Sequence, residues 1–175
     1  KNLKHINNEI PYFINNYSRD YENMLAISHS DGEEKFINSL FSDVDDLISL
    51  DFKRVSSEDD ALIRIYKISE NSLIGGSFET IGLATPIGSN QNYITGEEYI
   101  ELLWKEQPLE NIYYDNNRNI NMGSNVIYPI NEASADIIVH EIGHALGLDH
   151  PKGDPFGSWH TTLDSAMSYN FEQLN

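Results

Sequence analysis

The chain of 175 residues contains no cysteine, few basic residues and no long apolar run. The absence of cysteine excludes disulfide scaffolds, thiolate metal sites and thiol nucleophiles. The longest apolar runs span only a few residues, such as Ile137-Ile138-Val139, so nothing approaches the ~18 residues that a membrane-spanning helix requires. The first residues are not followed by an apolar segment either, and we expect that any signal peptide has been removed.

Basic side chains are outnumbered, because 11 Lys and Arg face 28 Asp and Glu, which gives a net charge of −17. An acidic surface repels phosphate, so we expect neither a nucleic-acid partner nor docking on an anionic membrane. The hydrophobic share of 39% is ordinary for a globular protein once glycine is added. The length predicts one domain with one core.

Hydrophobic periodicity predicts a fold of the α+β class with a mixed sheet. Apolar residues at helical spacing predict a helix over residues 31–50, with Asp31 as N-cap. A second helix is expected at residues 131–146, where Asn131 or Ser134 could be the N-cap. Strands are expected at residues 9–14, 50–55, 61–68, 81–87 and 111–115, a short helix or structured insert at 95–107, and a loop at 116–125.

The most informative segment is an eleven-residue stretch that holds three of the six histidines. Its pattern is H-E-x-x-H-x-x-G-x-x-H, with His140, Glu141, His144, Gly147 and His150 at the fixed positions. At ordinary amino-acid frequencies, five fixed positions of these types would match by chance in roughly one chain of this length per 10⁵. The pattern therefore indicates a functional site.

The spacing of this motif suits a metal site. Residues i and i+4 lie on one face of a helix, about 5–6 Å apart at Cβ, so His140 and His144 can bind one ion. Glu141 points about 100° around the helix, which suits a residue that holds water rather than the metal. Gly147 permits a positive φ that turns the chain back, so His150 can approach the same ion. Three imidazoles leave a position for water, as in catalytic zinc sites.

A zinc ion at this place would lower the pKa of the water and polarise a carbonyl oxygen. Glu141 would then take the proton of the water and pass it to a leaving amine. Two alternatives stay open, namely a surface helix with unrelated histidines and a structural three-histidine metal site. The structural site would have no need of Glu141.

The sequence resembles a known superfamily at these residues and at Ser165-Ala166-Met167-Ser168-Tyr169 downstream. The histidine motif followed by a Met-turn is the signature of the metzincin metallopeptidases. Pro151 after the third histidine and the Met-Ser-Tyr sequence are most similar to the serralysin family. The resemblance implies that Met167 forms an apolar floor under the histidines. It also implies that Tyr169 is a zinc ligand that can swing away to support the tetrahedral intermediate; on the residues alone, both could be ordinary core residues.

The resemblance implies one zinc endopeptidase domain over residues 1–175. Residues 1–147 would form an upper subdomain with a twisted sheet, an N-terminal helix and the active-site helix. Residues 148–175 would form a short lower subdomain with the Met-turn. The family normally continues with a further helix, so we expect either a truncated lower subdomain or a minimal relative of the family. Only 17 positions separate His150 from Met167, fewer than in typical serralysins, which leaves the specificity open.

The resemblance also implies partners and location. Residues 83–88 resemble the edge strand on which these peptidases bind a protein or peptide substrate as an added antiparallel strand. An ordinary strand near a proline is the alternative. We further expect a secreted monomer, on the resemblance alone.

Calcium binding stays open but no motif supports it. Asp115, Asn117, Asn119 and Asn121 alternate like the start of an EF-hand loop. The loop would need Gly at its sixth position, where Ile120 stands, and Glu at its twelfth position, where Val126 stands. The glycine-rich calcium-binding repeats of serralysins are also absent from the sequence.

Several other polar residues are candidates for parts of the site. His160 could act at its edge, but the sequence favours a solvated loop histidine because nothing fixes its position. His5 and His29 are expected at the surface. Asp149 and Asp164 could orient ligand imidazoles or be plain surface carboxylates.

Two rival functions remain. The first is a zinc-binding module that keeps the fold without turnover. The second is a peptidase of another zinc class with a distant glutamate as third ligand, which His150 makes unnecessary.

Overall fold

A computed structural model describes residues 8–77, 80–91, 98–106, 120–121, 127–128, 130, 132–154, 156–161 and 164–169. The strand expected at residues 111–115, the N-cap candidate Asn131, and His5, which is expected at the surface, lie outside the described residues. The elements are, in order, β1 (Glu9–Ile14), β2 (Arg19–Tyr21), β3 (Met24–Ile27), α1 (Asp31–Asp45), β4 (Asp51–Arg54), the 3-10 helix η1 (Glu58–Asp60), β5 (Ile63–Ile68), β6 (Gly82–Gln91), β7 (Glu98–Lys105), β8 (Ile120–Asn121), β9 (Ile127–Tyr128), α2 (Glu132–Ala145) and the 3-10 helix η3 (Pro151–Gly153).

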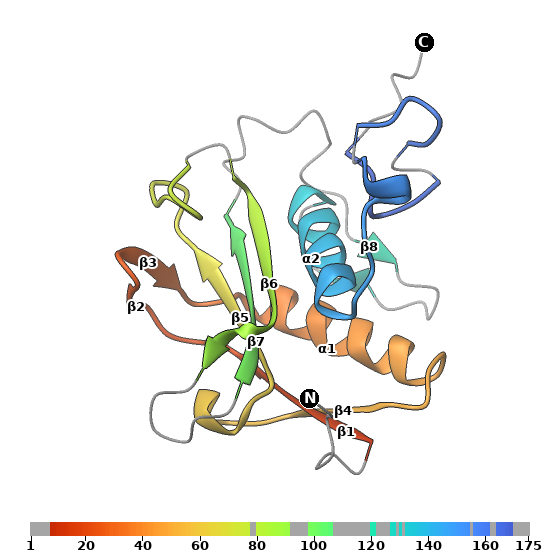
Figure 1. Cartoon of the computed structure of the whole chain (residues 1–175). Helices are drawn as coiled ribbons and strands as arrows, with labels where there is room; N and C mark the ends of the chain where they lie inside the picture. The colour runs from red at the N-terminus through yellow and green to blue at the C-terminus, as the bar shows by residue number, and fades with distance from the viewer. Residues whose placement is uncertain are drawn as a thin grey trace.

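Strands β1 to β7 form one seven-stranded mixed sheet (Figure 1). From one edge the order is β4, β1, β5, β7 and β6; the first four are parallel, and β6 is antiparallel to β7. The hairpin of β2 and β3 joins the end of β5, where Ala26 pairs with Ile68. The predicted α+β class with a mixed sheet is confirmed.

The side chains of β5 alternate between two cores. Ile63 and Ile65 pack with residues of α1 and α2, including Phe36 and Ile138. Tyr66 belongs to a second cluster on the other face, under the hairpin. Both helices therefore cover one face of the sheet (Figure 1). Side chains of β2 lie over part of the other face, where the ring of Tyr21 stacks on that of Tyr66.

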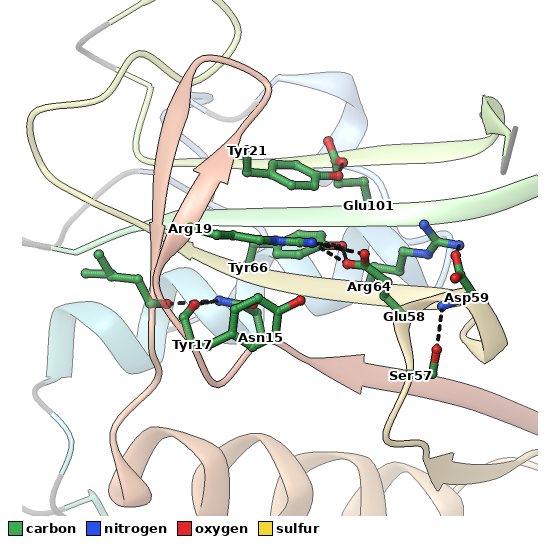
Figure 2. A network of polar contacts seen from close by, with 11 residues as sticks. Asn15, Tyr17, Arg19, Tyr21, Ser57, Glu58, Asp59, Arg64, Tyr66 and Glu101 are labelled. Atoms are coloured by element: carbon green, nitrogen blue, oxygen red, sulfur yellow. Dashed lines mark hydrogen bonds and ion pairs between the residues drawn. The ribbon is translucent and has the colours of Figure 1, made fainter.

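A network of polar side chains joins the hairpin to this second face (Figure 2). Arg19 on β2 forms an ion pair with Glu58, and Glu58 accepts a hydrogen bond of 2.7 Å from the hydroxyl of Tyr66. Tyr21 donates its hydroxyl hydrogen to Glu101 on β7. Burial raises the pKa of the Glu101 carboxyl. The network fixes the hairpin on the face of the sheet that the helices leave uncovered.

The prediction of a short helix or structured insert at residues 95–107 is wrong, because residues 98–105 form β7. This strand lies between β5 and β6, and its residues Leu102, Leu103 and Trp104 are all buried. A strand that is covered on both faces has a continuous apolar run rather than an alternating pattern. Periodicity alone does not distinguish such a run from a buried helix.

Helix α1 has a different start and end from those predicted. Its N-cap is Ser30 rather than Asp31, because Ser30 and Glu33 form a reciprocal capping box. The helix ends at Asp45, five residues before the expected end. The carboxylate of Asp45 accepts a hydrogen bond from the backbone N–H of Phe52, which starts the turn into β4, and Leu47 is 82% exposed.

The other boundaries differ by smaller amounts. The first strand has the predicted bounds, whereas β6 extends four residues beyond the predicted end. Helix α2 begins at Glu132, so Ser134 lies inside its first turn and is not the N-cap. Residues 120–121 pair with Ile127–Tyr128, so part of the predicted loop is strand β8. Among the described residues, no helix is long and apolar enough to cross a membrane.

Candidate metal centre

The three histidines of the motif converge at the end of α2. His140 and His144 lie one turn apart on this helix, and His150 lies on the segment that follows it. One ring nitrogen from each lies within 4.8 Å of the others, and the Nε2 atoms of His140 and His150 are 3.3 Å apart. The three predicted ligands are therefore close enough to bind one metal ion.

Gly147 brings His150 back to the helix, as the sequence predicts. Its φ is +90°, which glycine adopts without the steric cost of a side chain. The N–H of Gly147 donates to the carbonyl of His144, and the N–H of Leu148 donates to the carbonyl of Gly143, both at 2.9 Å. These two bonds are the Schellman motif, which ends a helix and redirects the chain.

Backbone carbonyls fix the orientation of two of the rings. His140 Nδ1 lies 2.7 Å from the carbonyl oxygen of Ala166, and His144 Nδ1 lies 3.0 Å from that of Leu148. A carbonyl only accepts, so each Nδ1 bears the hydrogen and each Nε2 presents a lone pair. Metal-binding histidines are typically held in this way.

Neither of the two candidate carboxylates, Asp149 and Asp164, forms a hydrogen bond with a ring nitrogen of the triad at short distance. Asp149 accepts a hydrogen bond of 2.8 Å from the N–H of His150, and the same oxygen lies 4.0 Å from His150 Nδ1. Asp164 accepts from the backbone and hydroxyl of Thr161. Asp149 therefore faces one ligand ring, whereas Asp164 closes a local turn.

The electrostatics of the triad fit a bound cation. Burial, together with the charges of His144 and His150, lowers the pKa of His140 to about 4, in opposition to the hydrogen bond with the Ala166 carbonyl. Burial also lowers the pKa of His150. The neutral His140 ring thus points an Nε2 lone pair at a nitrogen only 3.3 Å away. A His150 ring that bears its hydrogen on Nε2 can donate to this lone pair, and a metal ion can take the place of that hydrogen between the two nitrogens. The donor set therefore fits a metal ion.

Glu141 lies beside the triad and points toward β6. The side chain is almost fully buried, and its carboxylate accepts a hydrogen bond from the backbone N–H of Ala84. Burial raises its pKa to about 7, in opposition to that hydrogen bond. A carboxyl with a pKa near neutrality can both accept and release a proton at physiological pH.

Met167 and Tyr169 lie at the triad, where the resemblance expects them. Met167 is buried, and a Cβ built on Gly143 of α2 would lie 2.6 Å from its sulfur, so the side chain packs directly under the helix. The ring of Tyr169 stacks on that of His140, with centroids 4.6 Å apart. Burial and the charge of Glu141 raise the pKa of the Tyr169 hydroxyl.

A cavity of about 360 Å³ connects these groups with strand β6. Among the described strands, β6 pairs with β7 alone, so it is the edge of the sheet on this side. Figure 1 shows β6 running alongside α2, with the segment after the helix beyond it. The cavity is lined by Gly82, Leu83, Ala84 and Pro86 of β6 and by Glu141, His144, His150 and Tyr169.

Two histidines are placed differently from their predictions. His160 is 8% exposed rather than solvated, and its ring nitrogens lie 3.1 Å from Ser168 Oγ and 3.3 Å from the carbonyl oxygen of Pro151. His29 is 5% exposed rather than at the surface, and it accepts a hydrogen bond of 3.0 Å from the Trp104 indole. Both lie in polar stretches of sequence, so only long-range contacts reveal their burial.

No model of a known protein family matches the chain, and no curated protein matches it either. The function of the site is therefore inferred from its geometry and from the histidine motif.

Proposed function

We propose that the chain is a zinc-dependent endopeptidase of the metzincin type that hydrolyses extended protein or peptide substrates. The single observation that supports this most is the joint position of three histidines, Glu141 and an edge strand around one cavity. A structural metal site would have no use for a buried carboxyl that faces the cavity.

Zinc is the metal that this donor set suits best. Three imidazoles with a free position are typical of catalytic zinc sites. Two nitrogens at 2.0–2.1 Å from one tetrahedral ion are about 3.3 Å apart, which matches the 3.3 Å between His140 and His150. When bound, zinc would lower the pKa of a water molecule and polarise the scissile carbonyl.

The protein side chains would supply the remaining steps. Glu141 would accept a proton from the attacking water and donate it to the leaving amine, which its pKa of about 7 suits. Tyr169 would donate a hydrogen bond to the developing oxyanion. The free edge of β6 would bind the substrate main chain as an antiparallel strand. A secreted location remains a prediction from the resemblance.

The test is hydrolysis of an unfolded protein by the wild-type chain, with and without a zinc chelator, beside E141Q. Removing a general base typically costs about 10²–10⁴ in rate, so E141Q should lose almost all activity. Its zinc content should stay at the wild-type value, because Glu141 is not one of the ligands.

A chelator-insensitive activity, or an E141Q variant as active as wild type, would contradict the proposal. A folded, zinc-loaded wild-type chain that cleaves no substrate would instead favour the silent zinc-binding module.

A further inference from the structure

The segment after α2 holds both His150 and Tyr169, whose ring centroids are 5.3 Å apart. His150 lies near the start of this segment, and Tyr169 ends its described part. These two rings can belong to the same site only if the two ends of the segment are held in a fixed position relative to each other. His160, about midway between them in the sequence, has contacts that hold the two ends together.

The imidazole of His160 contacts the residue next to Tyr169 and the residue next to His150. Its Nδ1 lies 3.1 Å from Ser168 Oγ, directly before Tyr169, and its Nε2 lies 3.3 Å from the carbonyl oxygen of Pro151, directly after His150. His160 is buried, although Ser158 and Trp159 before it are exposed. The ring therefore lies between the two ends of the segment rather than in solvent.

One neutral tautomer satisfies both contacts. The Pro151 carbonyl only accepts, so Nε2 bears the hydrogen and donates it. Nδ1 then has a lone pair and accepts from the hydroxyl of Ser168. A ring that donates at one end and accepts at the other fixes the direction of both bonds.

Each end of this bridge is tied to the metal centre. On one side, the N–H of Gly153 donates to the carbonyl of His150 at 2.8 Å, which closes the turn that contains Pro151. On the other side, Ser168 follows Met167, whose sulfur packs against Gly143 of α2. A shift of His160 would thus move His150 relative to the histidines of the helix.

We propose that His160 is a positioning residue that holds the segment of His150 against the segment of Tyr169 and so sets the metal affinity of the centre. His160 does not itself bind the metal. The effect on metal binding rests on the three histidines alone, whereas any effect on hydrolysis rests on the proposed function.

The experiment measures the Zn²⁺ dissociation constant and the visible spectrum of the Co²⁺-substituted chain for wild type, H160A, H160N and H160Q. Groups that orient metal ligands typically contribute 10–100-fold in affinity, and we expect H160A to bind Zn²⁺ about 10-fold more weakly. Its Co²⁺ spectrum should change, because the spectrum reports the ligand geometry. H160N places its amide near Nδ1 and H160Q near Nε2, so each should restore part of the affinity.

The matched control is H29A, because His29 is as buried as His160 but contacts Trp104 and the backbone of Asn15 instead. H29A should destabilise the metal-free chain and bind Zn²⁺ as wild type does. The inference is overturned if H160A keeps the wild-type affinity and spectrum, or if H29A weakens binding equally. If H160A does not fold, H160N and H160Q give the same readouts.

The outcomes for the two proposals are distinct. Wild-type metal binding without hydrolysis would reject the peptidase and leave the role of His160 intact. A wild-type chain that binds neither Zn²⁺ nor Co²⁺ would reject the metal centre and the role of His160 together.

Discussion

At the scale of the residue, the position of Glu141 depends on a glycine in the neighbouring strand. A Cβ at Gly82 would lie 2.2 Å from Glu141 Oε1, well inside contact distance. Gly82 is thus needed for the close approach of β6 to α2. Oε1, Cδ and Cγ of Glu141 would all have to move away from this Cβ. They belong to one flexible side chain, so the backbone need not shift.

We therefore expect G82A to fold and to displace the carboxylate of Glu141. General-base catalysis contributes about 10²–10⁴ in rate, and a misplaced base should lose at least about 10-fold in kcat/KM. Zinc affinity should stay at the wild-type value, because the three atoms nearest to a Cβ at Gly82 all belong to Glu141 and none to a histidine. Measured kcat/KM and zinc content test this, and wild-type activity in G82A would show that Glu141 tolerates the shift.

A second prediction at this scale concerns His29 and pH. Burial lowers the pKa of His29 from 6.5 to about 4. Below pH 6.5 the unfolded chain therefore binds a proton that the folded chain does not. The stability contributed by the neutral ring is complete above pH 6.5, falls as the pH drops toward 4, and is constant below that. One pKa unit corresponds to about 1.4 kcal/mol, so the loss amounts to roughly 3 kcal/mol.

Urea unfolding of wild type and H29Q between pH 8 and 4 measures this effect. Gln can still accept from the Trp104 indole but gains no proton in this range. The difference in unfolding free energy between the two chains should shift by roughly 3 kcal/mol in favour of H29Q as the pH falls. Parallel pH profiles for the two proteins would mean that His29 has the same pKa in the folded and in the unfolded chain.

At the scale of the element, the N-terminus of α1 is stabilised by its capping box. The N–H of Glu33 donates to Ser30 Oγ at 3.2 Å, and the N–H of Ser30 donates to the Glu33 carboxylate at 2.7 Å. Replacing a serine N-cap by alanine costs about 1 kcal/mol. S30A should therefore lower the urea midpoint without changing zinc affinity.

The control is the same substitution in the same helix at S42A. Ser42 is exposed in the interior of α1, where alanine is the better helix former, so stability should rise by up to about 0.5 kcal/mol. Equal losses in S30A and S42A would indicate that the capping box adds nothing.

The elements that the sequence predicts well are those in which the local pattern agrees with the environment. β1 is rich in aromatic residues and isoleucine, α1 has apolar residues at helical spacing on its buried side, and α2 ends at Gly147. β5 is buried along its whole length but alternates in sequence, whereas the buried run of β7 shows no alternation and was therefore not recognised as a strand. The end of α1 was missed because Leu47 continues the periodicity although it is exposed.

One part of the candidate site could likewise be predicted from the sequence, and another part could not. His140, His144 and His150 could be predicted because helix geometry and one glycine turn place them from spacing alone. The groups that orient the ligand rings could not, since they are the backbone carbonyls of Ala166 and Leu148 and leave no trace in the side-chain sequence.

At the scale of the whole molecule, a bound metal would join two parts of the chain. His140 and His144 lie on α2, which packs in the main core, while His150 lies on the segment beyond the Gly147 turn. The folded chain presents all three nitrogens together, whereas the unfolded chain does not. Metal binding should therefore stabilise the folded state by RT ln(1 + [L]/Kd), which is about 4 kcal/mol at a thousandfold excess over Kd.

For a chain of this length, 1 kcal/mol shifts the Tm by about 2–4 °C, so a thousandfold zinc excess should raise the Tm by roughly 10 °C. Thermal unfolding followed by circular dichroism, with zinc or with chelator, measures the shift. H144A keeps two of the three ligands and should lose most of it, while S42A should keep it in full. Equal melting temperatures for the wild-type chain with and without zinc, under conditions where the metal binds, would mean that the unfolded chain binds the ion as tightly as the folded chain does. A shift that H144A keeps in full would mean that the ion is held outside the three-histidine site.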